Sequence, residues 1–156
     1  MTDEGSEQAV QRRTIRTLSV AQIFSGLATA GSIPAGSLLA ATIVDSDAVA
    51  GLAQTAGVVG AAALALPLAR LALSHGRRPA LALGYAIGVV GAVVVVVGGA
   101  AANLTGVLIG CFLVGSASAA GLQARYAATD LAAPRHRARA LSWVVWAGTV
   151  GAVLGP

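Results

Sequence analysis

Residues 79–124 read PALALGYAIGVVGAVVVVVGGAAANLTGVLIGCFLVGSASAAGLQA and contain no charged residue and no histidine. A helix that crosses about 30 Å of hydrocarbon needs about 20 apolar residues, because each residue adds about 1.5 Å. The stretch is too long for one such helix and long enough for two. Asn103 and the glycines before it favour a turn in the middle. The stretch therefore predicts two spanning helices, at about 79–100 and 104–127.

The rest of the chain repeats this alternation of long apolar runs and short polar connections. It predicts two earlier spanning helices, at about 17–44 and 48–73, on either side of an acidic turn. A fifth helix is expected at 140–156, which is short for a span. Residues 1–16 are polar and are expected to form a disordered cytoplasmic tail. The predicted fold class is an all-α polytopic membrane protein, with its transmembrane bundle over residues 17–156.

Composition supports a membrane protein and argues against soluble classes. Of the 156 residues, 56% are hydrophobic and only 10% are charged, whereas soluble domains carry about 25% charged residues. The sequence pI near 10.6 does not indicate nucleic-acid binding, because lysine is absent and no basic face is interleaved with aromatic residues. Cys111 is the only cysteine, so no intrachain disulfide can form.

All ten basic residues are arginines, and they gather in three clusters. Between neighbouring clusters lies enough apolar sequence to cross a bilayer twice, so a hairpin of two helices returns the chain to the side it left. All three clusters can therefore lie on one side, which the bias of arginine toward cytoplasmic loops identifies as the cytoplasm. This pattern predicts a multi-pass protein of the cell membrane with a cytoplasmic N-terminus. The clusters are Arg12, Arg13 and Arg16; Arg70, Arg77 and Arg78; and Arg125, Arg135, Arg137 and Arg139.

The connection between the second and third predicted helices ends in Gly76-Arg77-Arg78. This order resembles the signature of the major facilitator superfamily, which reads Gly, three residues, Asp, Arg, any residue, Gly and two basic residues. The chain keeps the second glycine and the basic pair. Other residues stand at the remaining positions, namely Ala69, Leu73 and Ser74.

The connection between the fourth and fifth helices resembles the same family more fully. The family typically carries there an aromatic residue, an Asp four residues on, a Pro and a basic run. Tyr126, Asp130 and Pro134 match this order, and arginines follow. Arg125 and Tyr126 are expected at the headgroup level, where aromatic residues and snorkelling arginines lie.

The end of the chain resembles a motif that antiporters of the family carry in the fifth helix: Gly, eight residues, Gly, three residues and Gly-Pro. Gly151, Gly155 and Pro156 match it, and Ser142 stands where the first glycine is expected. Together the resemblance covers about residues 12–156. It implies a carrier of the antiporter or drug-efflux kind.

In such transporters, twelve helices form two six-helix halves around a central solute site. The resemblance therefore implies that this chain supplies most of an N-terminal half, cut inside the fifth helix. Its expected partners are the lipid bilayer, a small-molecule solute, and either the missing C-terminal half or further copies of the chain. No nucleic acid, cofactor or metal is expected.

The resemblance also places a cytoplasmic charge network on Asp130 and on the arginines of the two inner connections. Such a network can lock the cytoplasmic ends of the helices in one state and release them in another. Leu73 replaces the family's usual carboxylate, so the lock is expected to be weakened or rebuilt around Asp130. The alternative is that these arginines only set the topology. The arginines concerned are Arg70, Arg77, Arg78, Arg137 and Arg139.

In the resembled family, the first and fourth helices line the solute cavity. A spacing of three or four residues places four polar side chains on one face of the first helix. An apolar cavity with few hydrogen-bonding groups suits a hydrophobic or amphipathic solute. The alternative is that the hydroxyls bond their own backbone. The candidates are Gln22, Ser25, Thr29 and Ser32 in the first helix, and Ser116, Ser118 and Gln123 in the fourth.

No Asp, Glu, His, Lys or Arg lies in the middle of a predicted span, although such residues usually mark proton or ion coupling. Drug-proton antiporters of the resembled family carry, in the fourth helix, an Arg three residues before a Gln-Gly pair. The matching positions here are Cys111, Val114 and Gly115. This part of the chain therefore offers no proton carrier.

The predicted function is transmembrane transport of a small solute by a secondary carrier of the major facilitator type, with efflux of a hydrophobic or amphipathic compound as one form of it. The alternative is a non-transporting membrane protein, either a truncated product or an assembly subunit. An intramembrane enzyme fits poorly, since His75 and His136 lie in loops and no span pairs a nucleophile with a base.

Overall fold

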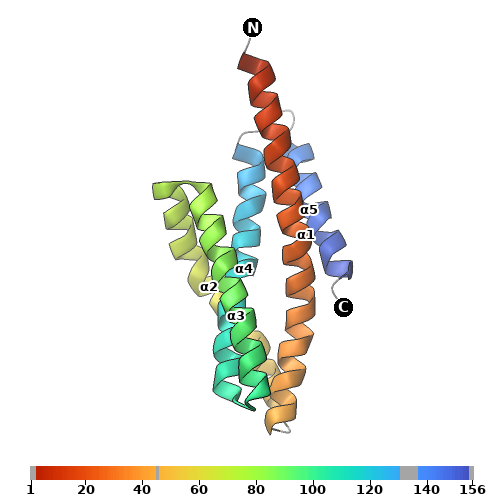
Figure 1. The fold of residues 1–156 in the computed structure, drawn as a ribbon, viewed down its shortest axis with the longest axis vertical. Helices are drawn as coiled ribbons and strands as arrows, with labels where there is room; N and C mark the ends of the chain where they lie inside the picture. Colours follow the sequence, from red (N-terminus) through yellow and green to blue (C-terminus); the bar gives the residue numbers. More distant parts are fainter. Residues whose placement is uncertain (1–2, 45, 131–136, 155–156) are drawn as a thin grey trace.

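A computed structural model describes residues 3–44, 46–130 and 137–154. These residues form five helices and no strand, so the predicted all-α class is confirmed (Figure 1). The helices are α1 (Asp3–Val44), α2 (Asp47–His75), α3 (Arg77–Ala100), α4 (Leu104–Asp130) and α5 (Arg137–Leu154).

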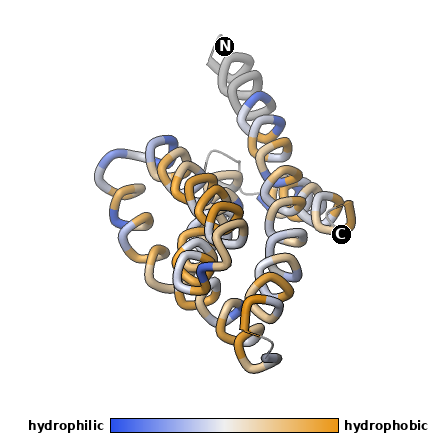
Figure 2. Tube along the Cα trace, turned by 60° about the horizontal axis from the view of Figure 1, so that its bottom comes forward, coloured by the Kyte–Doolittle hydropathy of each residue, from blue (hydrophilic) through white to orange (hydrophobic). Residues whose placement is uncertain are grey.

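Four of the helices, α1 to α4, contain segments long and apolar enough to cross a membrane. Apolar side chains cover much of their outer surface; Val96, for example, is 69% exposed. Figure 2 shows hydrophobic residues running along most of the helical tube. Such a surface suits contact with lipid. The shorter helix α5 begins with Arg137 and Arg139 and packs along α1.

The first helix begins earlier than the sequence led us to expect. Residues 1–16 were expected to form a disordered tail, whereas α1 begins at Asp3. The segment 7–13 reads EQAVQRR. Glutamate, glutamine, alanine and arginine all have high helix propensity, so the helix continues outward beyond the apolar run. The cytoplasmic location of this segment stays a prediction.

The turn between α3 and α4 shows why the long apolar stretch divides where it does. The Asn103 side-chain Oδ1 accepts a hydrogen bond of 3.1 Å from the backbone N–H of Gly106. This bond caps the first turn of α4, because it satisfies a donor that the helix itself leaves unpaired. At the other side of the turn, Ala101 and Asn103 donate backbone bonds to Val97 and Gly98.

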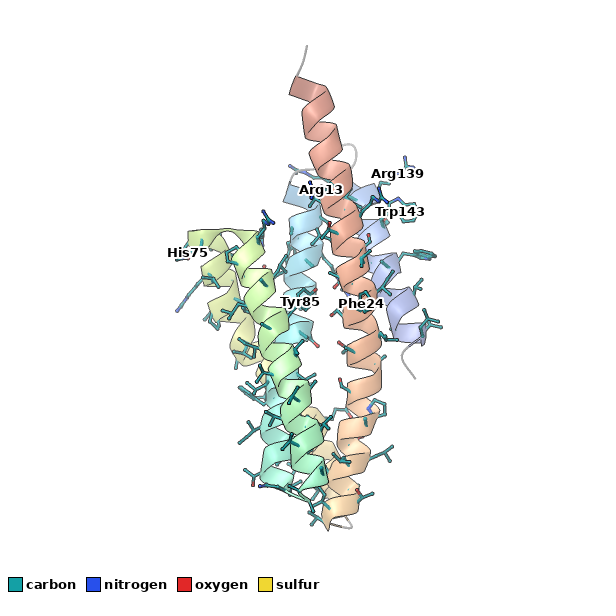
Figure 3. All side chains as sticks on the ribbon, in the orientation of Figure 1. Arg13, Phe24, His75, Tyr85, Arg139 and Trp143 are labelled. Carbon is teal, nitrogen blue, oxygen red and sulfur yellow. The ribbon has the colours of Figure 1, made fainter. Side chains whose placement is uncertain are left out.

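The bundle has two distinct ends. Figure 3 shows Arg13, His75 and Arg139 at one end, which we call the arginine end. The turns after α1 and after α3 lie at the opposite end, which we call the turn end (Figure 1). Among the described residues, members of all three arginine clusters therefore lie toward the same end of the structure.

Helix α4 lies at the centre of the bundle and contacts each of the other four helices (Figure 1). Against α3 the contact is made by small residues. A Cβ atom placed on Gly84 or Gly88 would lie 2.8 Å from the Cβ of Ala120 or Ala117, respectively. Small residues let two backbones approach closely, and this packing holds helices together where lipid offers little hydrophobic drive.

Candidate functional site

A polar cavity of about 400 Å³ lies between α1, α4 and α5. Helix α1 contributes most of its polar side chains, spaced by three or four residues along one face. Glycines on α4 and α5 leave the space open. The lining residues are Gln22, Ser25, Gly26, Thr29, Ala30, Ser118, Gly121, Leu122, Arg125, Gly148 and Ala152.

Gln22 is the best-positioned polar group in this cavity. Its side chain is 3% exposed and accepts a hydrogen bond of 3.4 Å from the Tyr85 hydroxyl of α3. It also lies between two glycines: a Cβ atom on Gly121 would be 3.2 Å from its Oε1, and one on Gly148 would be 3.6 Å from its Nε2. The amide of Gln22 therefore meets α3, α4 and α5 at one point.

Arg125 brings the only formal charge among the residues that line this cavity. Its side chain is half-buried, and its Nε atom is buried without a hydrogen-bond partner among the described residues. The sequence led us to expect Arg125 at the headgroup level, which stays a prediction, and the structure shows that its side chain lines the cavity.

The signal that could have identified Arg125 is its spacing. Arg125 lies seven residues after Ser118 and four after Gly121, and positions three, four or seven apart share one face of a helix. Tyr85 gave no such signal, because it stands alone in an apolar run.

A second, apolar cavity of about 220 Å³ adjoins the first. Thr29 and Ser118 line both cavities, so the two meet at these residues. The apolar cavity extends toward the turn end between α1, α2 and α4. Its lining residues are Thr29, Ser32, Ala53, Gln54, Gly57, Val58, Ala61, Val95, Cys111, Val114, Gly115 and Ser118.

Some of the residues that the sequence predicted to line a cavity do so in the structure, and others lie elsewhere. Those of α1 all line one of the two cavities: Gln22, Ser25 and Thr29 the polar one, and Thr29 and Ser32 the apolar one. The Ser32 hydroxyl also donates to the backbone oxygen of Thr29, at 3.3 Å. The local bonding considered as an alternative therefore occurs together with a position at the cavity.

Two candidates of α4 lie elsewhere. Ser116 is fully buried, and its hydroxyl is 2.8 Å from the backbone oxygen of Gly84 in α3. Gln123 accepts a hydrogen bond of 2.9 Å from Nη1 of Arg77. Both side chains serve the contact between α3 and α4, and neither is among the residues that line these two cavities. Their neighbour Ser118 lines both cavities instead.

The residues of the expected charge network gather at the arginine end. Arg70 and Arg78 are exposed on α2 and α3, and Arg137 and Arg139 are exposed at the start of α5. The side chain of Asp130 and the position of Pro134 lie outside the described residues. The bond from Arg77 to Gln123 ties the start of α3 to α4. The network around Asp130 stays a prediction.

The antiporter-like motif falls where α5 crosses α1. A Cβ atom placed on Gly151 would collide with the backbone of Ile23, and one on Gly26 would collide with the backbone of Gly148. The two helices are therefore in backbone contact. Gly155 and Pro156, the end of the motif, lie outside the described residues.

The family follows from this bundle and its sequence. The model of the Major Facilitator Superfamily matches residues 18–156. The chain belongs to this superfamily, whose members are membrane transporters and not enzymes.

Curated relatives agree with this assignment. Two uncharacterized MFS-type transporters of Bacillus subtilis strain 168, YdeG and YddS, are 37% and 34% identical over 150 residues, or 96% of this chain. The riboflavin transporter RfnT of Brucella anthropi is 30% identical over 151 residues, or 97% of this chain. The matches cover 35%, 34% and 38% of these relatives, so the chain spans about a third of their length. No solved structure matches the chain.

Proposed function

We propose that the chain forms part of a secondary carrier that moves a small solute across the cell membrane, along a path between α1 and α4. One observation carries this proposal: the polar cavity, in which Gln22 of α1 reaches between glycines of α4 and α5. A cleft or cavity with a few convergent polar groups is the usual form of a small-molecule site. Membership of the superfamily supplies the class of activity.

The proposed solute is a hydrophobic or amphipathic compound. The adjoining cavity supports this class, because Val95, Cys111 and Val114 line it with apolar surface. A relative named as a riboflavin transporter makes riboflavin a natural test solute. We propose efflux by antiport as the direction, supported by the resemblance at Ser142, Gly151, Gly155 and Pro156 to the antiporter motif.

The proposed carrier includes more protein than this chain, since the chain spans about a third of its relatives' length. Further helices or further copies of the chain would complete the wall of the path opposite α1 and α4. The chain's own contribution is then a bundle whose first and fourth helices face the solute.

The arginine end is the proposed cytoplasmic gate. Arg70, Arg77, Arg78, Arg137 and Arg139 would bind and release Asp130 as the carrier changes state. The gathering of the exposed arginines at one end supports this role. The bond from Arg77 to Gln123 supports it as well, because it already links the start of α3 to α4.

The orientation has its own test. Ser46 lies at the turn end and Ser74 at the arginine end, where Ser74 is exposed. In a Cys111→Ser background, we expect Ser46→Cys to react with an impermeant maleimide from outside the cell, and Ser74→Cys only after the membrane is opened. Reaction of both from the same side would contradict a cytoplasmic arginine end.

Transport is tested by accumulation in cells. We expect cells that express the complete carrier to accumulate riboflavin differently from cells without it, and Gln22→Ala to abolish the difference. Val96→Ala, on the exposed face of α3, is the matched control and should transport like the wild type. Identical accumulation with and without the protein would favour the non-transporting alternative.

A further inference from the structure

The Arg125 side chain supplies a positive charge to the polar cavity, and no carboxylate is among the residues that line it. We propose that Arg125 binds an anionic group of the solute, a carboxylate or a phosphate. This inference rests on the proposed transport function and adds the charge of the solute to it. The sequence alone placed Arg125 among residues that contact headgroups.

The state of the guanidinium supports this role. Its Nε is buried and has no hydrogen-bond partner among the described residues. A buried N–H group of a charged side chain that is left unpaired costs free energy. A carboxylate or phosphate can accept from Nε and a terminal nitrogen at once, because the guanidinium presents its donors in a planar fork.

The neighbours of Arg125 suit the same ligand. Gln22 and Ser25 of α1 line the cavity with it. The amide N–H of Gln22 and the hydroxyl of Ser25 can donate to further oxygen atoms of an anion. Gly121 and Gly148 keep the space around the Gln22 amide free of side chains.

The direction of the side chain favours a solute over a lipid headgroup. The next residue, Tyr126, is 60% exposed and points to the outer surface of the bundle. Arg125 lies about 100° from Tyr126 around the helix axis and lines the cavity between α1, α4 and α5, with its Nε atom buried. A side chain that snorkelled to headgroups would instead have its nitrogens at the surface.

The two adjoining cavities also fix the orientation of such a solute. Ser118, where they meet, lies seven residues from Arg125, which is about 10 Å along the helix. Cys111, in the apolar cavity, lies about 20 Å away on the same basis. The ligand is therefore an amphipathic anion, with its charged group toward the arginine end and its apolar part toward the turn end.

Binding by the purified full chain in phosphatidylcholine nanodiscs tests this inference without any measurement of flux. The probes are a dansyl-labelled six-carbon carboxylic acid, its methyl ester and the corresponding amine. Energy transfer from Trp143 and Trp146, the two tryptophans of the chain, reports binding. We expect the acid to bind about tenfold more tightly than the ester, as for a charge-assisted hydrogen bond, and the amine to bind most weakly.

Variants identify the group responsible. Arg125→Gln should weaken binding of the acid about tenfold and leave the ester unchanged. Arg125→Lys, which keeps the charge, should retain part of the preference for the acid. Arg16→Gln is the control, because it removes an exposed arginine of α1. The Arg16→Gln protein should bind all three probes like the wild type. Unchanged binding by the ester shows that the Arg125→Gln protein is folded.

Two results of the binding experiments would overturn the inference. One is equal binding of acid and ester by the wild-type protein, or no binding of either. The other is loss of the acid preference in nanodiscs that contain phosphatidylglycerol, together with loss of co-purified phosphatidylglycerol from Arg125→Gln, which would assign Arg125 to a lipid phosphate. Transport that depends on Gln22 but not on Arg125 would overturn this inference while leaving the proposed function standing.

Discussion

Two faces of the central helix α4 behave in opposite ways. The face toward α3 is packed without a cavity beside Ser116, and we call it the sealed face. There Ser116 is fully buried, and its hydroxyl bonds the backbone oxygen of Gly84. A Cβ atom on Gly91 of α3 would lie 2.6 Å from the backbone nitrogen of Val114. Toward α1 the helix is open: Ser118 lines two cavities. Ser116 and Ser118 are only two residues apart, so the same helix both fixes the bundle and faces the two cavities.

The two faces of α4 differ in what fills the space beside their small residues. On the sealed face, glycines let the backbone of α3 fill that space, and dispersion contacts hold the two helices together. On the open face, Gly121 leaves its space to the amide of Gln22 and to the cavity. Glycine content alone therefore does not show whether two helices are locked or kept apart.

The largest expected effect comes from forcing the sealed face open. Gly91→Leu places a side chain where Val114, Leu113 and the Gly110 carbonyl already lie within 3 Å of the new Cβ. We expect the free energy of unfolding, measured by SDS titration in mixed micelles, to fall by about 3 kcal/mol.

Gly51→Leu is the control for that substitution. Gly51 is an exposed helical glycine with no atom within 4 Å of a new Cβ, so stability should change by about 0.5 kcal/mol or less. Equal losses from the two substitutions would show that α3 and α4 are not packed as closely as the structure has them.

A smaller effect is expected from the polar link at the arginine end of the same interface. A double-mutant cycle of Arg77→Ala and Gln123→Ala should give a coupling energy of about 1.5 kcal/mol, because a charged donor bonds a partly buried amide. The same cycle with Arg78→Ala, an exposed neighbour, should give a value near zero. Similar coupling energies in both cycles would show that the general positive charge at the arginine end, and not the hydrogen bond from Arg77 to Gln123, produces the coupling.

The smallest effect concerns the single hydroxyl bond across the sealed face. Ser116→Ala should lower the free energy of unfolding by about 0.6 kcal/mol, a typical value for an interhelical bond in a membrane. Ser142→Ala removes a hydroxyl that bonds only within its own helix, to Ala138. If the two substitutions lower the free energy of unfolding equally, the bond from Ser116 to Gly84 does not stabilise the contact between α3 and α4.

The helices could be predicted from the sequence because hydrocarbon thickness sets a length that the apolar runs show directly. The turn at residues 101–103 could be predicted as well, since asparagine and glycine interrupt the run. The start of α1 could not, because residues 7–13 favour a helix without being apolar.

The site was harder to predict than the helices. Helix α4, which carries Ser116, Ser118 and Gln123, has small or apolar residues around most of its circumference. The periodicity of its hydrophobic residues therefore does not show which polar side chain faces a cavity. The direction of the Arg125 side chain could not be predicted for another reason. An arginine near a helix end is expected at headgroup depth whether its side chain points toward lipid or into the bundle. Only the packing of α1 and α5 decides between these two directions.

The most direct measurement compares the reactivity of the two serine positions. In a Cys111→Ser background, Ser118→Cys and Ser116→Cys would be treated with a small water-soluble maleimide in membrane vesicles. We expect Ser118→Cys to react readily, because its side chain lines both cavities, and Ser116→Cys to stay unreacted against α3. Equal reaction at both positions, or reaction at Ser116→Cys alone, would contradict a solute path between α1 and α4.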